Sequence, residues 1–370
     1  MLFILCFSAI YLSLNYYVYS RIVGGLNLQP GARKIMLPCF LTLAALFIPC
    51  QILNRHFGAV WISPILYLSS VWLGLSSIAF SIFLIADISR IVIRTGKFRY
   101  YATISALILI VLTSGYSLYN QAGNPLIKEI TIPIRKLPPA LNGFTIVHLS
   151  DLHVDVSKSD HLLKNLVEKT LALKPELLVI TGDLFDTDIR RMDNFCRILS
   201  GLNAKYGVYA VAGNHEFYNG IPLFMDIAEG LDIKVLRNTS VLIAEAIELA
   251  GIDDAHEAKR FLNISPEENL SKAFETVDFN KPVILLSHQP DVFALAREMG
   301  VDLQLSGHTH AGQIPPMDLL VQILYAYPFG MYQMASSYLY TTCGSAFWGP
   351  PMRLFSRSEI VKVILTTETD

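Results

Sequence analysis

Acidic side chains are almost absent from the first third of the chain. Residues 1–123 hold one of the 31 Asp and Glu residues, Asp87, but eight of the 29 Lys and Arg residues. This leaves 30 acidic and 21 basic residues for residues 124–370, which therefore carry net negative charge. Because binding to a phosphate backbone needs a basic surface, this balance argues against nucleic acid as the main partner of residues 124–370.

Cysteine is also scarce, and its positions exclude a disulfide framework. Three of the five cysteines, Cys6, Cys39 and Cys50, lie in long apolar runs. The other two, Cys196 and Cys343, lie far apart in the second part of the chain. A bridge between them is one alternative, and ordinary buried thiols are the expected state.

The first third is instead rich in long apolar runs. Four runs are each close to the roughly 20 residues that an α-helix needs to cross the hydrocarbon core of a bilayer. They cover residues 2–19, 35–53, 65–86 and 102–119. Any one of them could be a buried soluble helix, but four in succession favour membrane insertion. We therefore expect a transmembrane region of four helices over residues 1–122 and a second domain over residues 123–370.

The basic residues between these runs predict an orientation. A cleaved signal peptide would have its positive charge before the first run, but Arg21 follows that run. The first and third loops are rich in Lys and Arg, whereas the second loop has Arg55 alone. The basic residues of the first loop are Arg21, Arg33 and Lys34, and those in or just before the third loop are Arg90, Arg94, Lys97 and Arg99. Because Lys and Arg in short loops stay in the cytoplasm, residues 123–370 are expected on the non-cytoplasmic side of an integral, multi-pass membrane protein. Three basic residues after the last run count against this orientation.

Residues 123–370 alternate short apolar runs with helical stretches. Five runs of strand length end in polar residues: FTIVHLSD, ELLVITGD, GVYAVAGN, PVILLSHQ and VDLQLSGH. Helices are expected between them, over residues 159–173, 188–201 and 266–276 among others. This alternation predicts an α/β fold with helices on the faces of its sheets. Sites in such folds form beyond the carboxyl ends of the strands, so the five polar ends are expected to share one site.

The residues at these strand ends are of types that bind metal ions. They are Asp151, His153, Asp183, Asn214, His215, His288, His308 and His310. One Asp or Asn after a strand is usually a turn or cap, but five strand ends with related chemistry are hard to explain in that way. Carboxylate, amide and imidazole donors without thiolate suit Mn²⁺, Fe or Zn²⁺. An isolated His-x-His pair is most often two solvated loop residues, although on an extended backbone the two side chains share a face.

In chain order, the motifs D-x-H, G-D, G-N-H-E, H and G-H-x-H resemble those of the calcineurin-like metallophosphoesterase superfamily, over about residues 126–366. The resemblance implies a two-sheet β-sandwich flanked by helices. It also implies hydrolysis of phosphomonoesters or phosphodiesters with two divalent metal ions, of which Mn²⁺ is the first choice.

The resemblance further assigns a role to each motif residue. Asp151, His153 and His310 would bind one ion. Asn214, His288 and His308 would bind the other, and Asp183 would bridge the two. His215 would contact the substrate and act as an acid. The one-residue spacing of His308 and His310 suits two ions about 3.5–4 Å apart, and Gly307 would let the backbone approach closely.

Other polar residues near the motifs have alternative roles. Asp155, Asp186 and Asp188 could orient ligands, but capping of turns is expected for at least two of the three. His148 is expected to be a core residue, whereas His256 could touch the substrate.

The last part of the chain carries a narrower resemblance. PFGMYQ, YLYTTCGSAFWGPPMR and SEIVKVIL are similar to the membrane-attached branch of the superfamily, which includes phosphodiesterases and pyrophosphatases of the UDP-diacylglucosamine type. Cys343 departs from the small or basic residue usual there. Arg353 could contact phosphate or be structural. Residues 317–332 contain an apolar helical face that we expect to pack on the core, with membrane contact as the alternative.

These observations predict a membrane-anchored dinuclear-metal phosphoesterase. Its substrate would contain a phosphodiester, pyrophosphate or phosphomonoester bond and could be lipid-linked, and its partners would be the bilayer and that substrate. One alternative is a catalytically quiet membrane receptor or scaffold, but no motif position is lost. A second is a transporter with a regulatory domain, but the apolar runs lack the paired charges that transport needs.

Overall fold

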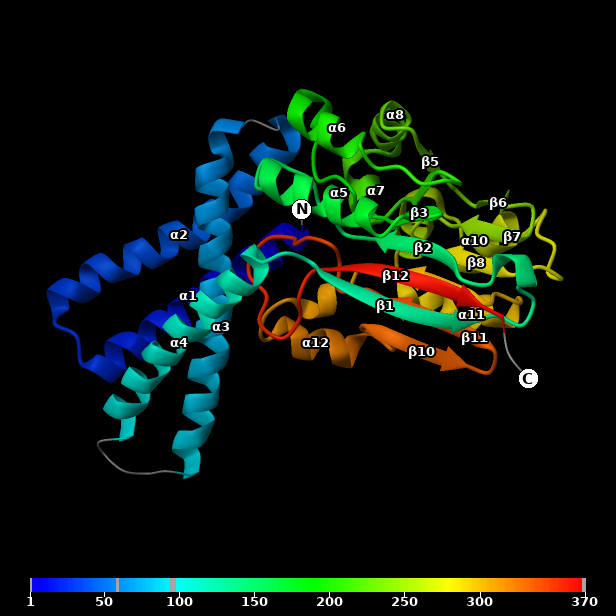
Figure 1. The fold of residues 1–370 in the computed structure, drawn as a ribbon. Helices are drawn as coiled ribbons and strands as arrows, with labels where there is room; N and C mark the ends of the chain where they lie inside the picture. Colours follow the sequence, from blue (N-terminus) through cyan, green and yellow to red (C-terminus); the bar gives the residue numbers. More distant parts are fainter. Residues whose placement is uncertain (1, 58–59, 93–97, 368–370) are drawn as a thin grey trace. The chain divides into compact units, whose positions relative to one another are not determined.

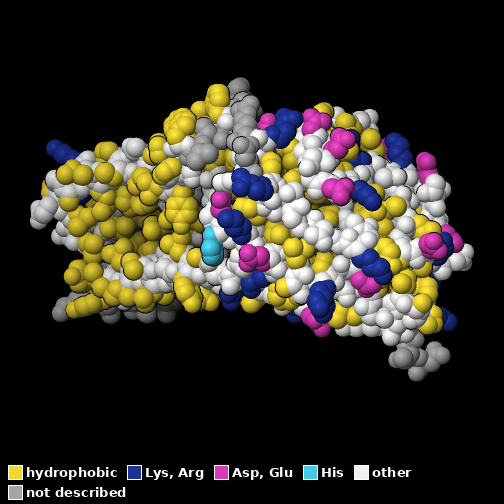
Figure 2. Space-filling view, turned by 45° about the horizontal axis from the view of Figure 1, so that its top comes forward, with side chains coloured by type: hydrophobic (Ala, Val, Ile, Leu, Met, Phe, Trp, Pro, Cys, Tyr) yellow, Lys and Arg dark blue, Asp and Glu magenta, His cyan; other side chains and the backbone are white. Residues whose placement is uncertain are grey.

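The computed structural model describes residues 2–57, 60–92 and 98–367. The chain divides into two compact units. The helical unit contains Met1–Gly123, Gly312–Leu320 and Gly349–Phe355. The α/β unit contains Asn124–Ala311, Val321–Trp348 and Ser356–Asp370. Figure 2 shows one face of the molecule, on which the side chains of the helical unit are mostly apolar and most charged side chains belong to the α/β unit.

Four long helices form most of the helical unit (Figure 1): α1 (Leu2–Leu26), α2 (Pro30–Phe57), α3 (Ser63–Val92) and α4 (Phe98–Ala122). Three stretches of the described chain are long and apolar enough to cross a membrane: Pro30–Arg55, Ser63–Ile91 and Arg99–Ala122. The first predicted span lies in α1, which is helical but is not among the three. The predicted count of four spans is therefore not confirmed.

Polar contacts join α1 to α3 inside the helical unit. The Oδ1 atom of buried Asn15 accepts hydrogen bonds from Trp72 Nε1 (2.9 Å) and Ser76 Oγ (3.1 Å). Near the other end of α1, Arg21 Nε lies 2.6 Å from Asp87 Oδ2. The second contact places the C-terminal ends of α1 and α3 at the same end of this unit.

The two short segments of the helical unit pack on its helices. Ser77 Oγ donates a hydrogen bond to the carbonyl of Pro315 (2.6 Å), and Ile78, Ile314 and Met352 share one apolar cluster. Arg353 is completely buried. Its Nε atom donates to Gln121 Oε1 (3.1 Å), and its backbone amide donates to the carbonyl of Ser117 (3.1 Å). These contacts favour the structural alternative for Arg353.

The α/β unit contains two mixed sheets of six strands each. In spatial order, the first is β1 (Leu126–Pro133), β12 (Glu359–Thr366), β2 (Phe144–Leu149), β3 (Leu177–Thr181), β4 (Val208–Val211) and β5 (Ile233–Val235). The second is β10 (Gly330–Met334), β11 (Ser337–Thr341), β9 (Leu303–Ser306), β8 (Val283–Leu286), β7 (Ile247–Gly251) and β6 (Thr239–Ile243). Strands β2 to β5 are parallel to one another, as are β7, β8, β9 and β11.

The two sheets share one apolar core. Ile146 and Val179 of the first sheet belong to the same buried cluster as Ile284, Leu286 and Leu305 of the second. All five side chains are completely buried. Each contributes roughly 1.5–3 kcal/mol of favourable transfer free energy, so this core fixes the sheets face to face. The α/β fold and its two sheets confirm the prediction, and all five predicted strand segments are strands.

Shorter helices cover the sheets, as Figure 1 shows. They are α5 (Asp160–Ala172), α6 (Asp193–Leu199), α7 (Asn214–Asn219), α8 (Ile221–Gly230), α9 (Ala255–Glu257), α10 (Pro266–Ala273) and α11 (Phe293–Glu298). A further helix, α12 (Met317–Leu324), has residues in both units. The helix expected over residues 188–201 is shorter than predicted. Asp188 accepts the backbone amide of Arg190 (3.1 Å) and so starts a separate 3₁₀ turn at Ile189–Arg191.

The apolar face of α12 does not pack on the core. Leu319, Leu320, Ile323 and Leu324 are 40–72 % exposed, whereas Val321 is buried. The expectation that this face belongs to the core was therefore wrong. The hydrophobic spacing is that of a helix in either case, so spacing alone could not distinguish the two environments.

Candidate metal centre

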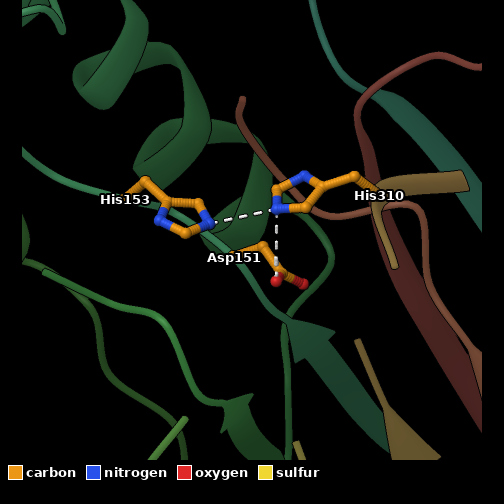
Figure 3. Close-up of side chains that lie close together, drawn as sticks. All are labelled: Asp151, His153 and His310. Atoms are coloured by element: carbon orange, nitrogen blue, oxygen red, sulfur yellow. Dashed lines mark hydrogen bonds and ion pairs between the residues drawn. The ribbon is translucent and has the colours of Figure 1, made fainter. Parts of the chain in front are cut away.

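A first group of donor atoms forms where β2 and β9 end (Figure 3). The Nε2 atoms of His153 and His310 are 3.0 Å apart, and Asp151 Oδ1 lies 3.5 Å from His310 Nε2. Asp151 and His153 are buried. Two imidazole lone pairs at this distance repel each other unless a proton or a cation lies between them. These three residues are those predicted to share one ion.

A second group consists of Asn214, His288 and His308. His288 Nε2 lies 3.0 Å from Asn214 Oδ1 and 3.0 Å from His308 Nδ1. His288 Nδ1 donates to the carbonyl of Thr181 (2.8 Å), so Nε2 is the ring nitrogen that faces this group. Burial lowers the pKa of His288, but Asp183 outweighs burial and raises it, so a metal ion would replace the proton on Nε2. Burial and the neighbouring His288 lower the pKa of His308 to about 3, so this ring is neutral and able to act as a ligand.

Asp183 lies between the two groups. Its Oδ2 atom is 3.6 Å from His153 Nε2 and 3.4 Å from His288 Nε2. Its Oδ1 atom accepts the backbone amide of His215 (2.9 Å). Burial alone would raise the pKa of Asp183, but His288 and His215 outweigh burial and lower it. Asp183 is therefore an anion placed where the prediction puts the bridging ligand.

The spacing of these donor atoms fits metal ions. Two nitrogen atoms at the usual distance of about 2.1 Å from one ion, and at right angles, lie about 3.0 Å from each other. That is the distance between His153 Nε2 and His310 Nε2, and also between His288 Nε2 and His308 Nδ1. Asp151 with His153 and His310, and Asp183 with His288 and His308, each form a group that could hold a metal ion. The donor set therefore suits two adjacent divalent cations.

The backbone at the ligands is left-handed, not extended. Asp151, His153, Asp183, His308 and His310 have φ values of 55°, 46°, 51°, 71° and 50°. The expectation that His308 and His310 lie on extended backbone, with their side chains on one face, is therefore wrong. The left-handed turns instead direct the two rings into different groups. Such conformations are unfavourable for residues with a Cβ atom, and they concentrate at functional sites.

Two glycines allow the loops to meet. A Cβ atom on Gly307 would lie 2.0 Å from Ser150 Oγ and 2.3 Å from Asp151 Oδ2. A Cβ atom on Gly213 would lie 2.3 Å from Asp183 Oδ1. The close approach predicted at Gly307 is therefore present, and Gly213 has the same role on the other side of the centre.

Asp186 contacts two of the predicted site histidines with one oxygen atom. Its Oδ1 atom lies 2.8 Å from His153 Nδ1 and 2.7 Å from His215 Nδ1. Asp188 and Asp155 instead accept backbone amides in turns. Two of the three nearby carboxylates are thus turn residues, as expected, and Asp186 contacts site histidines.

Charge at His215 is set by its acidic neighbours. Burial lowers the pKa of His215, but Asp186 and Asp183 outweigh burial and raise the pKa to about 9. Burial likewise raises the pKa of Asp186, but His153 and His215 outweigh it and bring that pKa well below its usual range. His215 therefore carries a proton at neutral pH and could donate it.

Three site residues were not predicted. Glu216 accepts the backbone amides of Gly213 (2.8 Å), Asp183 (2.9 Å) and Leu184 (2.8 Å), so it ties the β3 and β4 loops together. Its place in the G-N-H-E motif is the signal that could have identified it. Tyr325, whose hydroxyl lies 3.0 Å from His308 Nε2, has no such signal. The Trp348 ring lies beside His215, with 5.8 Å between ring centroids.

Two further predictions concern residues outside the donor groups. His148 is completely buried and its Nε2 atom lies 2.7 Å from Thr181 Oγ1, so it is a core residue as expected. Burial lowers its pKa to about 3. Cys196 and Cys343 are thiols rather than a disulfide.

Comparison with known proteins places these residues in a family. The calcineurin-like phosphoesterase family model matches residues 144–312. An uncharacterized metallophosphoesterase of Campylobacter jejuni is 30 % identical over 366 residues, which cover 94 % of this chain and 93 % of that protein. One from Aquifex aeolicus is 32 % identical over 244 residues, covering 65 % and 91 %.

A longer relative is the "transmembrane protein with metallophosphoesterase domain" of Danio rerio. It is 33 % identical over 283 residues, which cover 74 % of this chain and 64 % of that protein. The chain therefore spans somewhat less than two thirds of the length of this relative.

Proposed function

The chain belongs to the calcineurin-like phosphoesterase family, and we propose that it is a metal-dependent phosphoester hydrolase anchored in a membrane by its N-terminal helices. The observation that carries this proposal is the convergence of seven predicted ligands on two adjacent donor groups. They are Asp151, His153, Asp183, Asn214, His288, His308 and His310. An inactive receptor would have no need to retain the whole set.

The two donor groups would hold two divalent cations, with Asp183 between them. Mixed carboxylate, amide and imidazole donors suit Mn²⁺, Fe or Zn²⁺, and we propose Mn²⁺ as the first ion to test. When bound, two such cations neutralise the charge of phosphate oxygens and lower the pKa of a water molecule, so that hydroxide is available near neutral pH.

The residues of the chain supply the rest of the chemistry. His215 is protonated beside Asp186 and would pass its proton to the oxygen of the leaving group. Asp186 Oδ1 lies 2.7 Å from Nδ1, so Nε2 would be the ring nitrogen that faces the substrate. Phosphodiesters, pyrophosphates and phosphomonoesters all contain a leaving-group oxygen that could accept this proton.

The domain boundary is proposed near residue 122, with four membrane helices before it. α1 is proposed as the fourth because it shares polar contacts with α3 that would be costly in lipid if unpaired. The contact of Arg21 with Asp87 supports basic loops on one side of the membrane. The α/β domain is then proposed on the non-cytoplasmic side. Arg94 and Lys97, which contribute to this argument, lie outside the described residues.

A lipid-linked substrate is the finer part of this proposal. It is supported by the exposed apolar face of α12, formed by Leu319, Leu320, Ile323 and Leu324. Such a face can lie in the headgroup layer of a bilayer. Because α12 begins a few residues after His310, the chain leads directly from the centre to this face.

The proposal can be tested with the purified full chain in detergent. After chelation, the protein is assayed with and without Mn²⁺ on bis(p-nitrophenyl) phosphate, p-nitrophenyl phosphate, a glycerophosphodiester and a lipid-linked pyrophosphate. We expect turnover of at least one ester that requires the metal and is lost in His308→Ala. Equal rates in the wild type and this variant on every ester would refute the proposal.

A further inference from the structure

A pocket of about 580 Å³ lies beside the second donor group, within the α/β unit. Asn214 and His308 form one side of it. The other lining residues are Tyr218, His256, Glu257, Gln289, Pro290, Asp291, Leu324, Tyr325, Ala326 and Tyr327. This volume is typical of small-molecule sites and is far larger than a phosphate group needs. The pocket therefore has room for the part of a substrate that is attached to the phosphate.

The walls of the pocket are aromatic and acidic. Three tyrosines line it, and Tyr218 donates a hydrogen bond to Glu257 Oε1 (2.9 Å). None of the described lining residues is Lys or Arg. His256 Nε2 lies 2.6 Å from Asp291 Oδ2, so these two groups neutralise each other. The third charged group of the lining is the carboxylate of Glu257, whose ion-pair partner Arg260 does not itself line the pocket.

Glu257 lacks a hydrogen-bond donor at one of its oxygens. The residue is 7 % exposed, and its Oε2 atom is buried without a hydrogen-bond partner among the described residues. Arg260 Nη1 lies 3.5 Å from Oε2, but the Arg260 side chain is 67 % exposed. A buried carboxylate oxygen without a donor is unfavourable. The other oxygen, Oε1, accepts from Tyr218 and has a second lone pair that a donor on a ligand in the pocket could occupy.

The position of Glu257 in the chain is also unusual. It ends α9, and the next five residues, Ala258–Leu262, form a single π-helical turn. Such turns are rare and occur often at functional sites. The turn follows the two residues of this segment that line the pocket, His256 and Glu257.

We propose that this pocket binds the alcohol esterified to the phosphate and selects one that carries hydrogen-bond donors, an amino alcohol or a polyol. This inference rests on the proposed function and narrows its substrate class. An ammonium or hydroxyl group would donate to the carboxylate of Glu257 in a pocket that three tyrosines also line, and cations are attracted to aromatic faces. If the substrate were a pyrophosphate, its second phosphate would occupy this pocket and would meet the carboxylate of Glu257 and no Lys or Arg among the lining residues that the structure describes. The favoured substrate is therefore a phosphodiester, not a pyrophosphate.

Four p-nitrophenyl phosphodiesters test this selection because they share one leaving group. Their second alcohol is ethanolamine, glycerol, ethanol or 3-hydroxypropanoate. We expect kcat/KM of the Mn²⁺-loaded full chain to be at least about tenfold higher for ethanolamine or glycerol than for ethanol, since a site built for a donor rejects an analogue that lacks it. The carboxylate ester should be the poorest of the four.

Glu257→Gln should lower the ratio of kcat/KM for the preferred ester to that for the ethanol ester by about tenfold. The matched control is Glu268→Gln, on exposed α10, where Glu268 contacts Lys272. This control should keep the wild-type ratio. If Glu257→Gln is unstable, the kcat/KM values of the wild type for the four esters still show whether the pocket selects alcohols that carry hydrogen-bond donors.

Two results would overturn the inference. Equal or higher kcat/KM for the ethanol or carboxylate ester in the wild type would refute the pocket assignment and leave the proposed function in place. No metal-dependent turnover of any ester would refute the proposed function, and the pocket assignment with it.

Discussion

The Nε2 atoms of His153 and His310 face each other at 3.0 Å, although 157 positions separate the two residues in the chain. Asp186 occupies the other ring nitrogen of His153 at 2.8 Å. In the neutral tautomer that Asp186 favours, Nδ1 carries the proton and Nε2 carries the lone pair. The arrangement of His153 therefore presents a donor atom toward the place where a cation would lie.

Asp186 is thus predicted to be a positioning residue for both His153 and His215. Asp186→Asn should lower kcat by about 10- to 100-fold and raise the Mn²⁺ concentration that gives half-maximal activity, as is usual when a partner of a ligand is lost. The melting temperature should change little. Asp188→Asn is the matched control, since Asp188 caps a turn two residues away. A large loss of stability without a change in Mn²⁺ requirement would show that Asp186 is only structural.

The proposed orientation can be tested with reporters. Alkaline phosphatase fused after residue 370 should be active, and fluorescent protein at the same position should be dark. Fusions after residue 99, before most of α4, should give the opposite pattern. The reverse of both patterns would place the α/β domain in the cytoplasm.

The apolar face of α12 is predicted to serve lipid-linked substrates. Leu319 and Ile323 are 59 % and 70 % exposed and do not line the pocket. Because burial of each side chain in lipid contributes roughly 1.5–3 kcal/mol, changing both to Ser should reduce hydrolysis of a lipid-linked phosphodiester in vesicles at least tenfold. Hydrolysis of a soluble aryl phosphodiester should be unchanged.

The control for α12 is the double change Leu242→Ser and Ile127→Ser, at two other exposed positions of the α/β unit. It should affect neither substrate. If the α12 variant lost both activities equally, with a lower melting temperature, the helix would be structural and the lipid proposal would lose its support.

His148 is predicted to make stability depend on pH. Its pKa of about 3 in the folded protein lies below the usual value of 6.5 because burial disfavours the charged ring. The unfolded chain therefore binds the proton more readily between these values, so stability falls as pH drops below about 6.5. Between pH 6.5 and 5 the loss from this residue is about 2 kcal/mol.

His148→Gln should flatten that dependence in thermal unfolding at the two pH values. His161→Gln, at an exposed position of α5, should keep the wild-type slope. Parallel slopes for wild type and His148→Gln would show that the buried ring makes no such contribution.

The fold and the donor residues could largely be predicted because both are encoded locally. Strands β2, β3, β4, β8 and β9 each end in a polar motif, and the packing of the two sheets brings those ends together. Asp151, Asp183 and His288 therefore lie together although each was identified from a few neighbouring residues. The α12 segment was predicted as a helix for the same reason, since its periodicity is local.

The remaining features depend on long-range packing. Left-handed backbone at Asp151 and His308 could not be predicted, because residues with a Cβ atom rarely adopt it. The contact between Tyr325 and His308 requires the path of a loop that no motif marks. The exposure of Ile323 depends on what surrounds α12, which hydrophobic periodicity does not reveal.

The central claim is a pair of metal ions bridged by Asp183, whose Oδ2 atom lies within 3.6 Å of His153 and His288 nitrogens. Its most direct test is a titration of the metal-free wild type and Asp183→Asn with Mn²⁺, counting bound ions per chain while turnover of an aryl phosphodiester is followed. We predict two ions and full activity for the wild type, but at most one ion and a rate at least about 100-fold lower for the variant. Two ions and an unchanged rate in Asp183→Asn would contradict the account.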